Sequence, residues 1–169
     1  MKRIKIPTMI MVMIMAFAAM LTSGSQKLPI SPVYCQEKSP DDKEETEQEI
    51  SSAFELINQM RESVGLEVFG WSKRLASDAK TRAMEASRLF SHTRPDGSKW
   101  YEVDSEHVYG ENLACNYFNY NELILAWMRN PAHFANLTSA FRNVGISVYY
   151  TDAGECFWAM ELGNLKEVT

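Results

Sequence analysis

Two apolar stretches near the C-terminus constrain the fold of this chain more than any other feature. Residues 144–150 and 155–162 alternate or run apolar, and Asp152 and Gly154 lie between them. Strand-length apolar segments joined by a short turn-forming segment are typical of a β-hairpin. We therefore expect a domain of the α+β class, in which this hairpin packs with the helices that precede it.

The segments before the hairpin have the three- and four-residue apolar spacing of helices. Helices are predicted from about 50 to 64, from 72 to 90, from about 121, and in a short segment that starts at Asn130-Pro131. Ser72 is expected to cap the second helix. Its buried stripe, mostly alanine, predicts close packing: Leu75, Ala79, Ala83, Ala86 and Phe90. Three tryptophans are predicted to anchor the core: Trp71, Trp127 and Trp158.

The first 25 residues have the three parts of a secretory signal peptide. Basic residues in positions 2–5 precede an uncharged apolar run over 9–21, and small residues follow at 23–25. The apolar run would span about 20 Å as a helix, short of the ~30 Å hydrocarbon core of a membrane. We predict that residues 1–25 are a signal peptide, that the protein is secreted, and that no stable transmembrane anchor is left after cleavage.

Residues 26–49 are predicted to be an acidic, disordered linker. Between residues 36 and 50 there are seven acids and two lysines, and such a segment buries too little apolar surface to offset the entropy of ordering it. Residues 50–165 then form one domain. The chain has a net charge of −5, which argues against nucleic acid as a partner, because its binding needs concentrated Lys and Arg.

The chain has three histidines and no local catalytic motif around them. His92 follows the second predicted helix, His107 lies in a polar stretch, and His133 lies in the short fourth helix. Glu111 follows Gly110 at what is expected to be the start of a helical or turn segment. No H-E-x-x-H, P-loop, G-x-S-x-G or paired C-x-x-C pattern occurs. Any metal or catalytic site must therefore be assembled from distant segments.

Four sequence blocks and an aromatic pair carry a resemblance to a known family. They are F-E-L-I-N-Q-M-R at 54–61 with Gly65-Leu66, F-S-H-T-R-P-D-G at 90–97, G-E-N-L-A at 110–114, A-W-M-R-N-P-A-H-F-A-N-L at 126–137, and Phe157-Trp158. In this order they resemble the CAP superfamily (cysteine-rich secretory, antigen-five and pathogenesis-related-one proteins, also called SCP-like), and in particular its bacterial secreted branch. The resemblance implies a three-layer α-β-α sandwich with a central antiparallel sheet flanked by helices.

The resemblance also implies a cleft that holds two histidines and two glutamates. His92, Glu111 and His133 match three of these positions, and the histidine pair is expected to bind a divalent metal, commonly zinc. Glu111 would be the catalytic group if the cleft activates a water. The second glutamate has no firm counterpart, and the acids in the right interval are Glu102, Asp104 and Glu106. With two histidines and one carboxylate, the metal is expected to be weakly bound, which favours binding over hydrolysis.

Three functions stay open at this point. The first is a binding or envelope-associated module whose cleft takes a metal and a small-molecule, peptide or cell-envelope ligand. The second is a metal-dependent hydrolase that acts on peptide or cell-wall material. The third is a surface interaction protein, in which His92, Glu111 and His133 form a purely structural polar network.

The three cysteines are too few for a disulfide framework. If the protein is exported, oxidising conditions favour a bond between Cys115 and Cys156. Cys35 would then remain as a free or intermolecular thiol.

Overall fold

The predicted hairpin is confirmed and forms the centre of a four-stranded sheet. The computed structural model describes residues 40–165. The strands, in chain order, are β1 (Gly70–Trp71), β2 (Gly110–Cys115), β3 (Asn143–Tyr150) and β4 (Cys156–Gly163). They lie in the order β1-β3-β4-β2, with β3–β4 and β2–β4 antiparallel and β1–β3 parallel. The sheet is therefore mixed rather than wholly antiparallel, and its parallel pair is confined to the two-residue edge strand.

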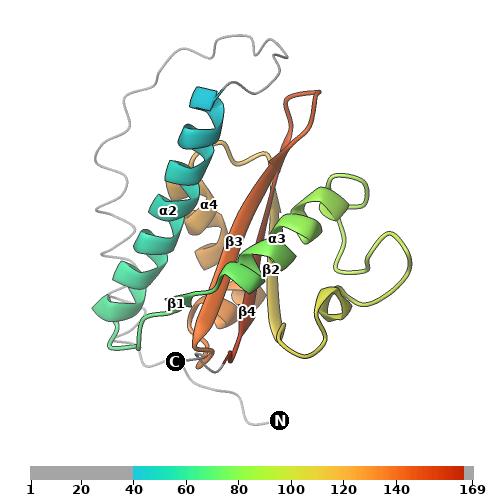
Figure 1. The fold of residues 1–169 in the computed structure, drawn as a ribbon. Coiled ribbons are helices and arrows are strands. Elements are labelled where there is room, and N and C mark those ends of the chain that lie inside the picture. The colour runs from blue at the N-terminus through green and yellow to red at the C-terminus, as the bar shows by residue number, and fades with distance from the viewer. Residues whose placement is uncertain (1–39, 166–169) are drawn as a thin grey trace.

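Helices cover both faces of the sheet and create three layers (Figure 1). The helices are α2 (Pro40–Ser63), α3 (Lys73–Ala86), the 3-10 helix η2 (Trp100–Val103), α4 (Tyr120–Arg129) and α5 (Pro131–Leu137). Helix α3 packs on one face, where Phe157 and Ala159 of β4 meet its alanines. On the opposite face, Trp158 and Met160 of β4 pack with α2, α4 and the end of α5. This arrangement confirms the predicted α-β-α sandwich.

The alanine stripe of α3 brings this helix unusually close to the sheet. Ser72 caps the helix as predicted, since its Oγ accepts a hydrogen bond from the Leu75 N–H at 3.2 Å. At Gly145 of β3, an added Cβ would lie 2.0 Å from the backbone nitrogen of Ala76, so only glycine fits beneath the helix. The helix ends at Ala86, earlier than predicted, and Phe90 is half exposed beyond it.

Helix α2 begins earlier than predicted and takes in part of the acidic segment. It starts at Pro40, whereas the sequence predicted disorder through residue 49 and a helix from about 50. The carboxylate of Glu49 accepts a hydrogen bond from the Tyr120 N–H at 3.0 Å, which joins α2 to the start of α4. The prediction of a disordered linker is therefore wrong for residues 40–49. Its remainder, residues 26–39, and the predicted signal peptide lie outside the described residues.

Two of the three predicted tryptophan anchors are buried. The Trp127 indole N–H donates to the carbonyl oxygen of Leu113 at 3.3 Å, and that of Trp158 donates to the carbonyl oxygen of Tyr117 at 2.7 Å. Trp71 is 39% exposed, contrary to the prediction, and packs edge-on against Phe54. Its place in the short edge strand β1 explains this exposure, because no further strand within residues 40–165 lies beyond it in the sheet.

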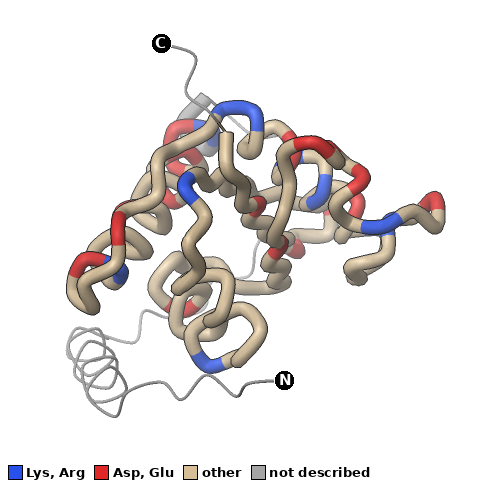
Figure 2. The backbone as a smooth tube through the Cα atoms, turned by 90° about the horizontal axis from the view of Figure 1, so that it is seen from below, with Lys and Arg blue, Asp and Glu red and all other residues tan. Residues whose placement is uncertain are grey.

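Basic and acidic residues are intermixed along the described part of the chain. Figure 2 shows Lys and Arg positions scattered along the tube and interspersed with Asp and Glu. Within residues 40–165, no helix has the length and apolar character needed to cross a membrane.

Candidate functional site

Glu111 lies on a strand, not at the start of a helical or turn segment as predicted. It is the second residue of β2, and its side chain points to the α3 face of the sheet, where it is 1% exposed. Gly110 precedes it at a crowded point. An added Cβ there would lie 3.1–3.2 Å from Phe141, Asn136 and Leu162. The Gly-Glu-Asn block therefore places a carboxylate inside the layer between α3 and the sheet.

Arg82 of α3 is the main partner of Glu111 and was not among the predicted site residues. Its Nε donates to Glu111 Oε2 at 2.6 Å and its Nη2 donates to Glu111 Oε1 at 3.2 Å, with the arginine side chain 0% exposed. A signal for this pair was present in the sequence. Arg82 follows Leu75 by seven residues and Ala79 by three, so it falls on the apolar stripe that α3 turns toward the sheet.

His92 lies above this pair and is fixed to it. Its Nδ1 is 2.6 Å from Glu111 Oε1, while its side chain is 54% exposed. Because an ionised carboxylate only accepts hydrogen bonds, Nδ1 carries the proton and Nε2 is the unprotonated nitrogen of the neutral ring. The loop around it is also held in place, since Arg82 Nη2 donates to the Ser91 carbonyl at 2.9 Å and the Trp100 N–H donates to the His92 carbonyl at 3.1 Å.

The electrostatics of Glu111 keep it ionised. Burial acts to raise the pKa of its carboxyl, but the hydrogen bonds from His92 and Arg82 and the charge of Arg82 outweigh burial and hold the pKa below its usual value. A carboxylate with a lowered pKa is a weak proton acceptor. The geometry therefore makes Glu111 a positioning group for His92.

A second ion pair supports the first from the exposed side. Glu85 accepts from Arg82 Nη1 at 2.6 Å and from Arg94 Nη2 at 2.7 Å. Burial acts to raise the pKa of Glu85, but the two arginines lower it overall. The loop that carries His92 is thus tied to α3 on both sides of the histidine, through Ser91 and through Arg94.

His133 lies on α5, which is attached to the same strand as Glu111. Asn136 Nδ2 donates to the Glu111 carbonyl at 3.0 Å and to Asn112 Oδ1 at 2.8 Å, and Asn112 Nδ2 donates to the His133 carbonyl at 3.2 Å. Burial and then the charge of His92 lower the pKa of the His133 imidazole. Both effects favour the neutral form of the His133 imidazole.

None of the three acids considered for the second glutamate position contacts this site. Asp104 pairs with Arg74 and with His107, Glu102 accepts from the Lys99 N–H at 3.0 Å, and the Glu106 backbone carbonyl accepts from the Tyr109 hydroxyl. These contacts organise the segment around η2. A second carboxyl near Glu111 must therefore come from another residue.

The carboxyl that does lie next to Glu111 is Glu161 of β4. The two residues are directly opposite each other in the antiparallel pairing of β2 and β4, and Glu161 is 0% exposed. Burial and the charge of Glu111 raise the pKa of Glu161 well above its usual value. The sequence does not single out this residue, because it lies in a largely apolar strand segment and the register that joins positions 111 and 161 is a tertiary feature.

The predicted bond between Cys115 and Cys156 is wrong for this structure, in which both thiols are free. The reason is the strand register. Cys115 is opposite Phe157, so its side chain shares the α3 face with Phe157, and Cys156 points to the opposite face. There its thiol donates to the Tyr117 carbonyl at 3.2 Å, and burial raises its pKa to about 11. Cys35 lies outside the described residues.

The metal ligands available at the site are two imidazoles. Across residues 40–165, no group of three or more His, Cys, Asp or Glu side chains is arranged to hold a metal ion. Glu111 accepts from both Arg82 and His92, so each of its carboxylate oxygens already has a partner. Imidazole nitrogen suits zinc, and a metal-bound histidine commonly donates its other N–H to a carboxylate, as His92 does to Glu111. The donor type therefore suits zinc, with His92 and His133 as the residues that would hold it.

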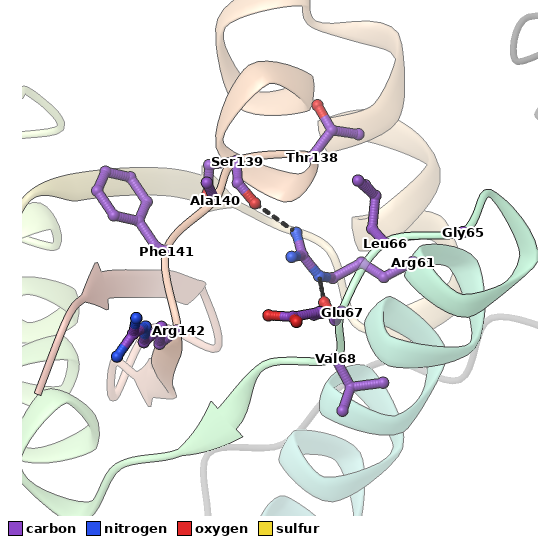
Figure 3. A pocket seen from close by; sticks show the side chains of 10 residues that line it. All are labelled: Arg61, Gly65, Leu66, Glu67, Val68, Thr138, Ser139, Ala140, Phe141 and Arg142. Carbon is purple, nitrogen blue, oxygen red and sulfur yellow. Dashed lines mark hydrogen bonds between the residues drawn. The ribbon is translucent and has the colours of Figure 1, made fainter. Parts of the chain in front are cut away.

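Two cavities are lined by other parts of the molecule. One, of about 400 Å³, lies among the end of α2, the segment after it, and residues 138–142 (Figure 3). Arg61 crosses its wall and donates to the carbonyl oxygens of Glu67, Leu137 and Ser139, which shows a structural role for this arginine. The other, of about 450 Å³, lies among α2, α3 and β3. Neither is lined by His92, Glu111 or His133.

Comparison with known proteins agrees with the geometry. The model of the cysteine-rich secretory protein (CAP) family matches residues 54–162, more than half of the chain. No match is found among curated proteins. Among solved structures, an extracellular SCP-domain protein from Bacillus anthracis superposes with a TM-score of 0.66 at 20% identity, over 77% of this chain and 45% of that protein. The chain thus spans less than half of that relative.

Two further structures share the fold. An outer surface protein from Borrelia burgdorferi has a TM-score of 0.64 at 20% identity, over 72% of this chain and 96% of that one. A cysteine-rich secretory protein from Staphylococcus aureus has a TM-score of 0.55 at 17% identity, over 72% of this chain and 40% of that one. Identities this low establish the fold alone. The family match over residues 54–162 shows that this chain belongs to the CAP family of cysteine-rich secretory proteins.

Proposed function

We propose that the chain is a secreted binding module whose ligand surface is the imidazole pair His92 and His133, held in place by Glu111 and Arg82. The observation that carries the proposal is the short contact between His92 Nδ1 and a buried, arginine-paired carboxylate, at 2.6 Å. This contact fixes the tautomer and leaves Nε2 free to accept a metal or a donor group of a ligand. The ring is half exposed, so a partner can reach it.

A divalent metal, with zinc preferred, is the first ligand we propose for this pair. His92 would bind it through Nε2 and His133 through one ring nitrogen, and bound zinc would supply an electrophilic centre for a donor atom of the ligand. The lowered pKa of His133 supports this, because only the neutral imidazole binds a metal. With two protein ligands, the remaining positions are left for water or for groups of the small-molecule, peptide or cell-envelope partner.

Binding is favoured over hydrolysis by the state of Glu111. A general base must accept a proton, and the carboxylate of Glu111 is already engaged by Arg82 and His92, which lower its pKa. The hydrolase alternative would need another proton acceptor beside the imidazoles. Of the acids predicted for that place, Glu102 accepts from the Lys99 N–H and Asp104 pairs with Arg74 and His107.

Secretion is supported by two independent observations. Residues 1–25 have the basic, apolar and small-residue parts of a signal peptide. The solved structures with the same fold include proteins described as extracellular and as an outer surface protein. We therefore place the binding module outside the cell.

Zinc calorimetry tests the proposal. At pH 7.5 the double variant His92→Ala/His133→Ala, which removes both proposed ligands, is expected to weaken zinc binding by about tenfold or more. The matched control is His107→Ala, which removes the third histidine, bound to Asp104 away from the site, and should leave the isotherm unchanged. Equal isotherms for wild type and the double variant would refute the metal proposal.

A further inference from the structure

The carboxyl of Glu161 is buried beside an ionised carboxylate and lacks a cation of its own. It is 0% exposed on the central strand β4, between Gly145 of β3 and Glu111 of β2. Gly145 presents no side chain, and α3 closes over it with Ala76 in the place a Cβ would take. Neither oxygen of Glu161 accepts a hydrogen bond from a donor among the described residues.

The charges that face Glu161 add to its isolation. From α3 these are Arg82 and Asp78, and from β2 it is Glu111. Arg82 commits its donors elsewhere: Nε and Nη2 to Glu111, Nη1 to Glu85, and Nη2 also to the Ser91 carbonyl. An ionised Glu161 would thus be a desolvated charge next to two other acids, which is prohibitively costly in a protein interior.

Glu111 has an acceptor position left for a proton on Glu161. A carboxylate offers about four lone-pair positions. His92 and Arg82 Nη2 use those of Oε1, and Arg82 Nε uses one of Oε2, which leaves one on Oε2. Glu161 lies directly opposite Glu111 in the antiparallel pairing of β2 and β4, and both residues are buried. Two ionised carboxylates cannot donate to each other, so a hydrogen bond between them requires a proton on one, and Arg82 keeps Glu111 ionised.

We propose that Glu161 is a positioning residue: a carboxylic acid that stays neutral in the folded protein at pH 7 and donates its proton to Glu111, which in turn orients His92. The three donors Arg82, His92 and Glu161 then fix the carboxylate from the helix, the loop and the neighbouring strand. The link between Glu161 and ligand binding rests on the proposed function above, whereas the protonation of Glu161 is independent of that proposal.

Infrared difference spectroscopy on the full chain tests the protonation without any ligand. Glu161→Gln keeps the shape and a donor but cannot ionise, so wild type minus this variant at pH 7 should show the C=O band of a protonated carboxylic acid. Glu102→Gln removes an exposed carboxylate and is the control, whose difference spectrum should contain carboxylate bands alone. Absence of the acid band from the Glu161 difference spectrum would overturn the proposal, whether or not the chain binds zinc.

The positioning step has its own readout, the NMR signal of the Nδ1–H proton of His92, which the hydrogen bond to Glu111 is expected to protect from exchange with water. Glu161→Gln should keep this signal, and Glu161→Met, which removes the donor, should lose it. Raising the pH until Glu161 ionises should abolish the signal in the wild type but not in Glu161→Gln, so the test holds even if the methionine variant does not fold. A signal equally persistent in wild type and Glu161→Gln across this pH range would overturn the positioning role.

Discussion

Arg82 and Glu111 form a buried ion pair that joins helix α3 to strand β2, with Arg82 Nε 2.6 Å from Glu111 Oε2. His92 is bonded to the same carboxylate from the exposed side. The pair therefore has two consequences, since it stabilises the contact between the layers and also sets the ring position and tautomer of the histidine that faces solvent.

Glu111→Gln should destabilise the fold strongly. The substitution keeps the shape of the side chain but leaves Arg82 as a buried charge without its main counterion, and breaking one partner of such a pair costs about 3–5 kcal/mol. Chemical denaturation measures the loss in the free energy of unfolding. Glu106→Gln, at an exposed position, is the matched control, and a loss no larger than that of the control would show that the buried pair does not hold the layers together.

Gly145→Ala should destabilise the protein by about 2 kcal/mol or more, because the new Cβ would overlap the backbone of α3. The same substitution at Gly70 is the control. There the Cβ would lie 3.3 Å from the Asn143 side chain, which can shift. Thermal unfolding of both variants makes the comparison, and similar melting temperatures would mean that α3 does not approach the sheet as closely as described.

Cys115 and Cys156 should both be free and should differ in reactivity. Cys115 is partly exposed, whereas Cys156 is buried and its pKa is raised to about 11, so it has little thiolate at pH 8. Alkylation of the native protein followed by peptide mass spectrometry should label Cys115 first. Under denaturing, non-reducing conditions both should be labelled, and a peptide pair joined through these two cysteines would contradict the structure.

The stability difference between wild type and Glu161→Gln should depend on pH. The pKa of Glu161 is raised above 4.5 in the folded state, so its contribution to stability is fully present below pH 4.5 and is lost as the pH rises toward the folded pKa. Over that window the wild type should lose about 1.4 kcal/mol per pH unit relative to the variant. Glu111, with its lowered pKa, has the opposite dependence, losing its contribution as the pH falls, mainly below this window.

Denaturation curves at pH 5, 6, 7 and 8 measure this difference. The two proteins share Glu111 and Arg82, so the opposing contribution largely cancels when their stabilities are subtracted. A difference that stays constant over the series would show that Glu161 has an ordinary pKa in the folded protein.

Local sequence patterns predicted the elements of the fold but not all their boundaries. The hairpin, the Ser72 cap and the start of α5 at Asn130-Pro131 are local features, and the structure confirms them. The start of α2 was missed because glutamate and lysine, which suggested disorder, are also good helix formers, and acids are favourable in the first turns of a helix. Composition alone therefore does not distinguish a disordered acidic segment from the first turns of a helix.

Only some residues of the site could be predicted from the sequence, for a related reason. The histidines and Glu111 were found by their motifs, whereas Glu161 becomes a neighbour of Glu111 only through the register of β2 and β4. The same register places Cys115 and Cys156 on opposite faces of the sheet, which no spacing reveals. Arg82 could not be predicted for another reason. An arginine on the apolar stripe of a helix indicates a buried ion pair only when an acid is known to face it.

The tautomer of His92 tests the central claim most directly. A long-range proton–nitrogen NMR spectrum above pH 7.5 distinguishes a ring protonated at Nδ1 from one protonated at Nε2. We predict that His92 is the Nδ1–H tautomer in the wild type. A wild-type His92 protonated at Nε2, the tautomer a free imidazole ring prefers, would contradict the claim that Glu111 and Arg82 hold this imidazole ready for a ligand.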